Sequence, residues 1–536
     1  MMEKEIELEL KKPEIVLLLI SLLIFLYFIL QATLPNPIVF GDEAFHVTLS
    51  EWMASNVEYP KYVPFEGTEL TKTGNFRPLL WNLLLASFNY IFGVSDLISK
   101  TLTPLITFSL GLAAFVLVKR LYGKVAGLVA TLVLISFPSV ITYTVFFYYA
   151  ALLLFFSSLS FLSFLVYVKE NSKKFLILSS IFASLALLTN QEAIPLYGVF
   201  ILYFAIKALK ERKLSYLKEI LPAIVILAVI PLGYFVRTYG VYGTPLCSRI
   251  PFLSFNTKGC NIDNFQGKYN WTGQAVPTST EQTVFSFGLI NYLAFAYGNP
   301  FFVVLPFLIG FALIYYKRTQ ERIPIFIFFL FLILVFPQVS GRAEDASRYT
   351  LTWSVVFALL ASLFYSEAYK KIESYNRFLP VAIVILVLYL TFASVLATTS
   401  NLSQVKAAWK DFVASCEKID KILPKNATIY TVWGHNAAHS CKRNIASGIP
   451  DMLLSYSSLN YTLKVLNENK IDYIFIQKSS IDFQNKGYAD NYPVAFVQLL
   501  ENNKQNFKVV YEDGSNLQEC LQTGNCNGSI VYQIIG

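Results

Sequence analysis

The chain has 536 residues, of which 55% are hydrophobic, 16% aromatic and only 15% charged. Soluble proteins carry roughly 25% charged residues, and a single hydrophobic core stops growing near about 250–300 residues. The apolar surplus must therefore face lipid, which excludes one large soluble domain. The net charge of +8 predicts no nucleic-acid partner, because the basic residues lie in short loops and no RNA- or DNA-binding motif accompanies them.

Uncharged stretches predict a polytopic α-helical membrane protein with about eleven transmembrane helices. A bilayer core of about 30 Å needs about 20 apolar helical residues. The stretch 125–168 contains no charge and is too long for one crossing, so we divide it near Pro138. The expected spans are 15–34, 101–118, 125–141, 146–168, 175–190, 194–206, 219–236, 296–316, 323–338, 349–366 and 379–398.

Two apolar segments leave other structures open. The segment 194–206 is short and follows the polar residues 190–192, so it forms with 175–190 either two spans or a re-entrant hairpin. The segment 79–93 is too short to cross and is expected as a helix along the membrane surface.

Basic residues orient the spans, because every second connection is short and basic, which is the positive-inside pattern. The N-terminus is therefore expected in the cytoplasm, and an odd number of spans places the C-terminus outside the plasma membrane. We expect a transmembrane domain at 1–400, with outer loops at 35–100 and 237–295, and an extracellular domain at 401–536. The basic clusters lie around Lys12, Lys119, Lys169, Lys210, Lys317 and Lys370.

Cysteines and glycosylation triplets agree with this orientation. Five Asn-x-Ser/Thr triplets begin at Asn270, Asn401, Asn426, Asn460 and Asn527, all on the predicted outside, although chance also produces such triplets in Asn-rich loops. Six cysteines lie on the same side, which indicates disulfides formed in an oxidising compartment. Pairing sequence neighbours would join Cys247 to Cys260, Cys416 to Cys441 and Cys520 to Cys526, but spacing alone does not prove the connectivity.

The last 135 or so residues alternate between helix-like and β-type stretches, which predicts a small α/β domain. The helix-like stretches are 405–422, 458–469 and 490–503, and the β-type runs are 427–432, 471–476, 507–511 and 530–535. His435 and His439 have a metal-ligand spacing for a helix. Gly434 and Asn436 make a loop as probable as a helix at this position. No carboxylate close in sequence completes a site, so no metal is expected here.

The first outer loop carries two adjacent carboxylates, Asp42 and Glu43, directly after the first span. Apolar residues then recur at helical spacing, which predicts an amphipathic helix in the membrane interface. Asp42 is either the N-cap of this helix, with Glu43 favouring its dipole, or a general base held at the membrane boundary.

Arginines on the same side of the membrane are candidates for binding an anion. Arg77 precedes the surface helix, and Arg342 and Arg348 lie in the last short outer loop. Each either extends its charge towards the lipid headgroups or binds a phosphate through paired hydrogen bonds.

These features together resemble the GT-C superfamily of membrane glycosyltransferases. The sequence is most similar to the branch of protein O-mannosyltransferases and aminoarabinose transferases, especially archaeal members. The resemblance is carried by the stretches 40–46, 76–84, 91–96, 119–123 and 347–349, and in the C-terminal domain by 466–476.

The resemblance implies inverting transfer of a sugar from a polyprenyl-phosphate (dolichyl-phosphate) donor to a protein, a lipid-linked glycan or an envelope lipid. It makes Asp42 the base, with Glu43 orienting Asp42 or the acceptor. It places Arg348 and Tyr349 on the donor phosphate, with Arg77 as a weaker candidate. No nucleotide cofactor is implied, and no metal is expected to be required, since 142–150 lacks the acidic residue that this branch often carries in that loop.

Two other functions share the membrane composition. A flippase or transporter for a lipid-linked glycan would favour internal repeats and charges in the middle of spans, neither of which the sequence contains. A non-catalytic membrane assembly subunit would make Asp42 dispensable.

Overall fold

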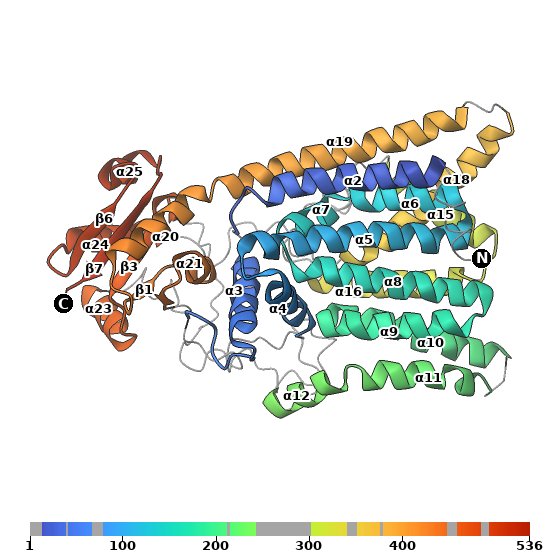
Figure 1. The fold of residues 1–536 in the computed structure, drawn as a ribbon, viewed down its shortest axis with the longest axis horizontal. Coiled ribbons are helices and arrows are strands. Elements are labelled where there is room, and N and C mark those ends of the chain that lie inside the picture. The colour runs from blue at the N-terminus through green and yellow to red at the C-terminus, as the bar shows by residue number, and fades with distance from the viewer. Residues whose placement is uncertain are drawn as a thin grey trace.

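The computed structural model describes residues 13–38, 41–66, 79–211, 215–242, 302–339, 351–375, 379–446, 458–483 and 492–535. Long helices lie side by side in a bundle, and a small sheet with its own helices lies beyond one end of this bundle (Figure 1). The expected class, a helical membrane domain followed by a C-terminal α/β domain, is confirmed.

Helices overlap all eleven expected spans within the described residues. They are α2 (Pro13–Thr33), α5 (Asp96–Tyr122), α6 (Lys124–Ser136) with α7 (Pro138–Val145), α8 (Tyr149–Glu170), α9 (Lys173–Thr189), α10 (Ile194–Glu211), α11 (Ser215–Val229) with α12 (Leu232–Tyr242), α15 (Val304–Tyr316), α16 (Arg322–Val339), α18 (Ser354–Glu373) and α19 (Leu379–Ala407).

The number of crossings is not confirmed as eleven. Six described helices are long and apolar enough to cross a bilayer, or up to eight if each of two bent pairs counts as one span. One of the six is Gln191–Lys210, so the segment proposed as half of a re-entrant hairpin is long enough for a full crossing. The pair α6 and α7 bends by 60°, because Pro138 lacks an N–H donor and begins a new helix.

Two short helices lie across the end of the bundle that faces the C-terminal domain (Figure 1). They are α3 (Gly41–Asn56) and α4 (Leu80–Phe92), at the positions expected for interfacial helices. Residues 43–50 of α3 are all buried, on every side of the helix. An amphipathic helix would bury one side only. Helix α3 is buried on its other side as well, because the C-terminal domain packs against it.

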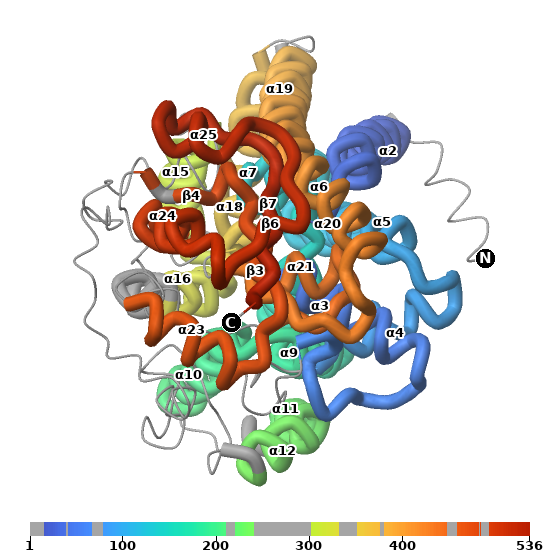
Figure 2. The backbone as a smooth tube through the Cα atoms, turned by 90° about the vertical axis from the view of Figure 1, so that its left-hand side faces the viewer, coloured from blue at the N-terminus to red at the C-terminus, as the bar shows by residue number. Residues whose placement is uncertain are grey.

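The C-terminal domain is built on a five-stranded mixed sheet of order β2-β1-β3-β7-β6. Figure 2 shows this domain in front of the end of the helical bundle. Strands β1, β2 and β3 are parallel, and β7 is antiparallel to both β3 and β6. The strands are β1 (Thr428–Tyr430), β2 (Asn444–Ile445), β3 (Tyr473–Gln477), β6 (Phe507–Glu512) and β7 (Ser529–Ile534), with β4 (Ile481–Asp482) and β5 (Tyr492–Pro493) in a separate pair. The helices are α20 (Lys410–Ile422), α21 (Gly434–Cys441), α23 (Leu459–Glu468), α24 (Val494–Asn502) and α25 (Leu517–Thr523).

Two of the expected disulfides are present. Cys416–Cys441 joins α20 to α21, and Cys520–Cys526 joins α25 to the residues that follow it. The expected pair of Cys247 and Cys260 lies outside the described residues. Helix α19 runs without a break from the bundle to residue 407, across the expected domain boundary at 400.

A close contact between two bundle helices predicts a sensitive position. A Cβ atom at Gly310 of α15 would lie 1.9 Å from the carbonyl oxygen of Leu360 in α18. Small residues allow membrane helices this approach. We expect Gly310→Ala to force the two helices apart and to destabilise the protein by about 1–3 kcal/mol, measured as a lower thermal unfolding temperature in detergent.

Gly233→Ala is the matched control, because a Cβ at Gly233 meets nothing within 4 Å. This variant should keep the wild-type unfolding temperature. Equal stability of the two variants would contradict the close packing of α15 on α18.

Candidate active site

Asp42 lies at the start of α3, half-buried, and has a partner from a distant loop. The hydroxyl of Tyr148 donates a hydrogen bond to Asp42 Oδ2 over 2.5 Å. Tyr148 is fully buried and belongs to 142–150, the segment in which the expected second carboxylate is missing. In this loop, the partner of Asp42 is therefore the hydroxyl of Tyr148 and not a second carboxylate.

The turn before Tyr148 has an unusual backbone. Phe147 adopts φ +52°, in the left-handed region that a non-glycine residue rarely enters. Its ring is fully buried and lies 5.3 Å from Trp81 of α4, between centroids. Such strain typically costs about 1–3 kcal/mol and is kept only where the surroundings enforce it. Here it turns the chain so that Tyr148 reaches Asp42.

Glu43 forms an ion pair with Lys406 that has no exposed side-chain surface. The Nζ of Lys406 lies 3.0 Å from Glu43 Oε1 and also donates to the carbonyl oxygen of Val145 over 3.0 Å. This contact joins α3, the end of α7 and the end of α19. Glu43 thereby anchors the helix start that carries Asp42. Its expected role in orienting Asp42 or the acceptor stays a prediction.

Further polar contacts tie the same junction. Lys100 of α5 donates to the carbonyl oxygen of Asn36 over 2.7 Å, and the Asn36 side chain donates to Ser403 of α19 over 3.0 Å. Nδ1 of His46 in α3 lies 2.7 Å from Oδ1 of Asn82 in α4. The ends of α2, α5 and α19 and the two surface helices therefore form one connected polar layer.

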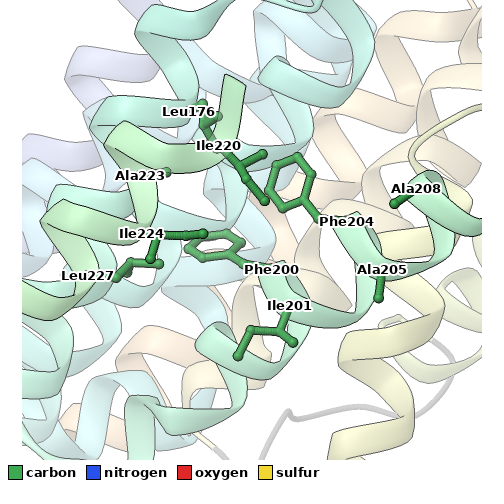
Figure 3. Close-up of a pocket in the computed structure, with 10 residues that line it drawn as sticks. All are labelled: Leu176, Phe200, Ile201, Phe204, Ala205, Ala208, Ile220, Ala223, Ile224 and Leu227. Atoms are coloured by element: carbon green, nitrogen blue, oxygen red, sulfur yellow. The ribbon is translucent and has the colours of Figure 1, made fainter. Parts of the chain in front are cut away.

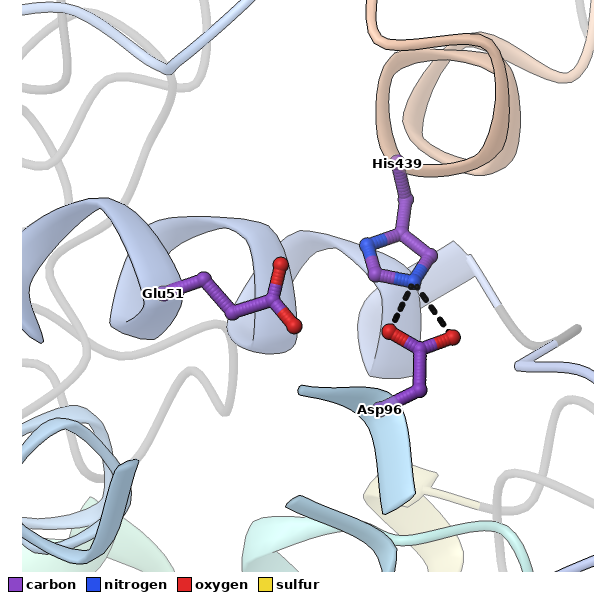
Figure 4. Close-up of side chains that lie close together, drawn as sticks. All are labelled: Glu51, Asp96 and His439. Atoms are coloured by element: carbon purple, nitrogen blue, oxygen red, sulfur yellow. Dashed lines mark hydrogen bonds and ion pairs between the residues drawn. The ribbon is translucent and has the colours of Figure 1, made fainter. Parts of the chain in front are cut away.

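Both histidines of α21 contact carboxylates of the first outer loop. His435 Nδ1 lies 2.5 Å from Oε1 of Glu66. His439 is buried, and its Nε2 lies 3.3 Å from Oδ1 of Asp96 at the start of α5 (Figure 4). No carboxylate lies near these histidines in the sequence, but the fold brings two carboxylates to them from more than 340 residues earlier in the chain. Of the two structures left open around His435 and His439, a helix or a loop, the chain forms the helix, α21.

Glu51 of α3 lies beside this pair. One ligand atom each of Glu51, Asp96 and His439 lie within 4.8 Å of one another (Figure 4). Burial raises the pKa of Glu51; His439 opposes this rise, and the neighbouring Asp96 carboxylate adds to it. The sequence did not predict this cluster. It places Glu51 on the polar face of an amphipathic helix, and nothing near Asp96 in the sequence indicates a partner.

The expected phosphate ligands Arg77, Arg342, Arg348 and Tyr349 lie outside the described residues, so their distance from Asp42 is not part of the structure. Arg237 of α12 is described. Its Nη1 is buried and has no hydrogen-bond partner among the residues that the structure describes. A guanidinium in that state is suited to bind an anion.

A cavity of about 250 Å³ lies between α9, α10 and α11 (Figure 3). Every residue that lines it is apolar, including Phe200, Phe204, Ile220 and Leu227. A sugar phosphate needs polar groups to orient it, so this cavity is not the catalytic site.

One family profile matches part of the chain. The profile of the dolichyl-phosphate-mannose-protein mannosyltransferases matches residues 76–235. No curated protein sequence matches the chain.

Solved structures match almost the whole chain in fold. ArnT from Cupriavidus metallidurans bound to undecaprenyl phosphate is similar with a TM-score of 0.62 and 12% identity, over 97% of this chain and 98% of ArnT. The apo oligosaccharyltransferase of Archaeoglobus fulgidus gives 0.63 and 11%, over 97% and 88%.

An archaeal oligosaccharyltransferase, AglB from Archaeoglobus fulgidus, has been solved in complex with an inhibitory peptide and a dolichol-phosphate. That structure is similar with a TM-score of 0.60 and 11% identity, over 95% of this chain and 81% of AglB. The expected resemblance is therefore confirmed, and the chain has the GT-C fold of these membrane glycosyltransferases.

Proposed function

We propose that this protein transfers a sugar from a polyprenyl-phosphate donor to an acceptor outside the membrane, with inversion at the anomeric carbon. The observation that carries the proposal is the half-buried Asp42, held by Tyr148 at the end of a helical bundle of GT-C fold. Undecaprenyl phosphate in ArnT and dolichol-phosphate in AglB support a lipid-phosphate donor. The acceptor classes remain protein, lipid-linked glycan and envelope lipid.

Asp42 is the general base in this mechanism. The acceptor hydroxyl gives its proton to the Asp42 carboxylate while its oxygen attacks the anomeric carbon from the face opposite the phosphate. The bond to the phosphate oxygen breaks, and polyprenyl phosphate leaves with the electron pair. The Tyr148 hydroxyl orients the carboxylate, so that little reorganisation is needed when the acceptor binds.

A cation must stabilise the negative charge on the leaving phosphate. We assign this role to Arg348 with Tyr349, as the resemblance implies, and keep Arg77 and Arg342 as alternatives. Arg237 joins them because of its buried Nη1. No nucleotide enters this reaction, and the expectation that it requires no metal stays a prediction.

Charge supports the orientation in the membrane. Arg120 pairs with Glu170 over 2.7 Å, and Lys317 with Glu367 over 2.7 Å, in connections at the bundle end that lies away from the C-terminal domain (Figure 1). We assign that end to the cytoplasm. Asp42 and the two disulfides then lie outside the plasma membrane, where disulfides persist.

Asp42→Asn tests the base. We expect turnover of a radiolabelled polyprenyl-phosphate sugar to fall by at least about 10²-fold, because the amide cannot accept the proton, while donor binding survives. Glu58→Gln is the control, since Glu58 is an exposed carboxylate of the same loop. Undiminished turnover in Asp42→Asn would remove the base, and transport of the donor without transfer would favour a flippase.

Tyr148→Phe tests the orientation of Asp42. The ring stays and the hydroxyl is lost, so we expect kcat to fall about 10-fold, the value of a hydrogen bond to a charged group, with KM for the donor unchanged. Tyr122→Phe is the control, because the buried Tyr122 hydroxyl at the other end of α5 has no hydrogen-bond partner among the described residues. An unchanged kcat in Tyr148→Phe would contradict this role.

Arginine variants separate the phosphate ligands. We expect Arg348→Ala to raise KM for the donor about 10-fold or more, since a hydrogen bond to a charged group contributes about 1.5–3 kcal/mol. Arg237→Ala should do the same only if its guanidinium contacts the phosphate. Arg318→Ala, at the opposite end of the bundle, should leave KM unchanged, and an equal effect there would show that the assay reports general damage.

A further inference from the structure

Three side chains from three distant segments meet outside the proposed catalytic site. Glu51 comes from α3, Asp96 from the start of α5 and His439 from α21 in the C-terminal domain (Figure 4). One imidazole nitrogen and two carboxylates are groups that divalent transition metals bind. The three ligand atoms lie within 4.8 Å of one another. The cluster joins the two domains of the chain.

The distance between His439 and Asp96 favours a metal over a direct bond. A charge-assisted N–H···O bond is about 2.7–2.9 Å long, whereas Nε2 lies 3.3 and 3.4 Å from the two Asp96 oxygens. Two ligands bound tetrahedrally at about 2.0–2.1 Å are about 3.3–3.4 Å apart. The spacing between His439 and Asp96 therefore fits two ligands on one cation, and Glu51 lies close enough to join them by a small side-chain movement.

The other ring nitrogen of His439 is placed as in a metal site. Its Nδ1 lies 3.0 Å from the Oγ1 of Thr48, which is buried on the same helix as Glu51. A metal-binding histidine almost always donates its second N–H to a neighbouring acceptor, which fixes the tautomer. In the tautomer in which Nδ1–H donates to Thr48, the Nε2 lone pair faces Asp96 and is available to a cation bound between them.

Charge and access also fit a divalent ion. The Glu51 and Asp96 carboxylates lie close together, and a divalent ion would offset their mutual repulsion. Lys100 is committed to the carbonyl oxygen of Asn36, and Lys442 is exposed. The Asp96 side chain is 45% exposed, which leaves an entry path from solvent.

We propose that Glu51, Asp96 and His439 bind one divalent transition-metal cation of the Zn²⁺ type, with water completing a tetrahedral site. The ion fastens α21 onto α3 and α5. It reinforces two neighbouring contacts between the domains, from His435 to Glu66 and from Ile445 N to Phe65 O over 2.7 Å. This site is structural, and it holds whether or not Asp42 is the base.

The test uses the purified full-length protein, stripped with a chelator and titrated with Zn²⁺ alone. Bound metal is measured by mass spectrometry after dialysis, and the unfolding temperature is recorded with and without Zn²⁺. We expect the wild type to retain one equivalent and to unfold at a higher temperature with Zn²⁺. Co²⁺ should give the absorption bands of a tetrahedral site.

Variants distinguish this site from general binding. Glu51→Gln and His439→Gln should lose the retained metal. Thr48→Val keeps all three ligands and should weaken binding about 10–100-fold, the usual effect of removing such a partner. Glu66→Gln, which alters the neighbouring contact with His435, is the control and should retain the metal.

Two outcomes would overturn the proposal. One is a folded wild type that retains no metal and gains no stability from Zn²⁺, which would leave a simple ion pair between His439 and Asp96. The other is equal metal loss in Glu66→Gln and Glu51→Gln. If His439→Gln fails to fold, Thr48→Val and the half-buried Glu51→Gln still decide the matter.

Discussion

The enclosed ion pair between Glu43 and Lys406 is the contact on which the arrangement of the site depends. Charges without exposed surface are tolerated only when they are paired, and loss of one partner leaves the other costly to bury, by about 3–5 kcal/mol. Lys406 also binds the carbonyl oxygen of Val145, three residues before Tyr148. One lysine at the end of α19 thereby positions both the helix that begins with Asp42 and the loop that supplies its partner.

The C-terminal domain is part of the same site region. A Cβ at Gly41 would lie 3.7 Å from the side-chain oxygen of Asn436 in α21, so this domain reaches the residue next to Asp42. Its contacts with Glu66 and Asp96 bind it to the middle and to the C-terminal end of the loop 35–100. Residues of both domains therefore lie close to Asp42. Under the proposed function, the C-terminal domain is suited to influence which acceptor reaches this residue.

Much of the fold could be predicted because it follows local rules. Uncharged runs of about 20 residues predicted the bundle helices, and β-type runs predicted the four longest strands. The stretch 125–168 was expected to divide into 125–141 and 146–168. This division matches the start of α8 at Tyr149, whereas the bend at Pro138 falls inside the first segment. The missed elements were short: α21 reads equally as a loop, and β2 has only two residues. The number of true crossings stays a prediction, since several helices are shorter than a bilayer requires.

The sequence by itself determined the membrane class, the polarity of charge along the bundle, the α/β character of the C-terminal domain and the candidate status of Asp42. The first three depend on composition or on spacing within a few turns, and the last depends on the position of Asp42 directly after the first span and on the resemblance to a family. Only the tertiary structure decided that Glu43 pairs with Lys406, that Tyr148 binds Asp42, and that His439 meets Glu51 and Asp96. These partners lie 106 to 388 residues apart. Local periodicity predicts helices and strands, but it does not predict which distant side chains meet when the helices pack.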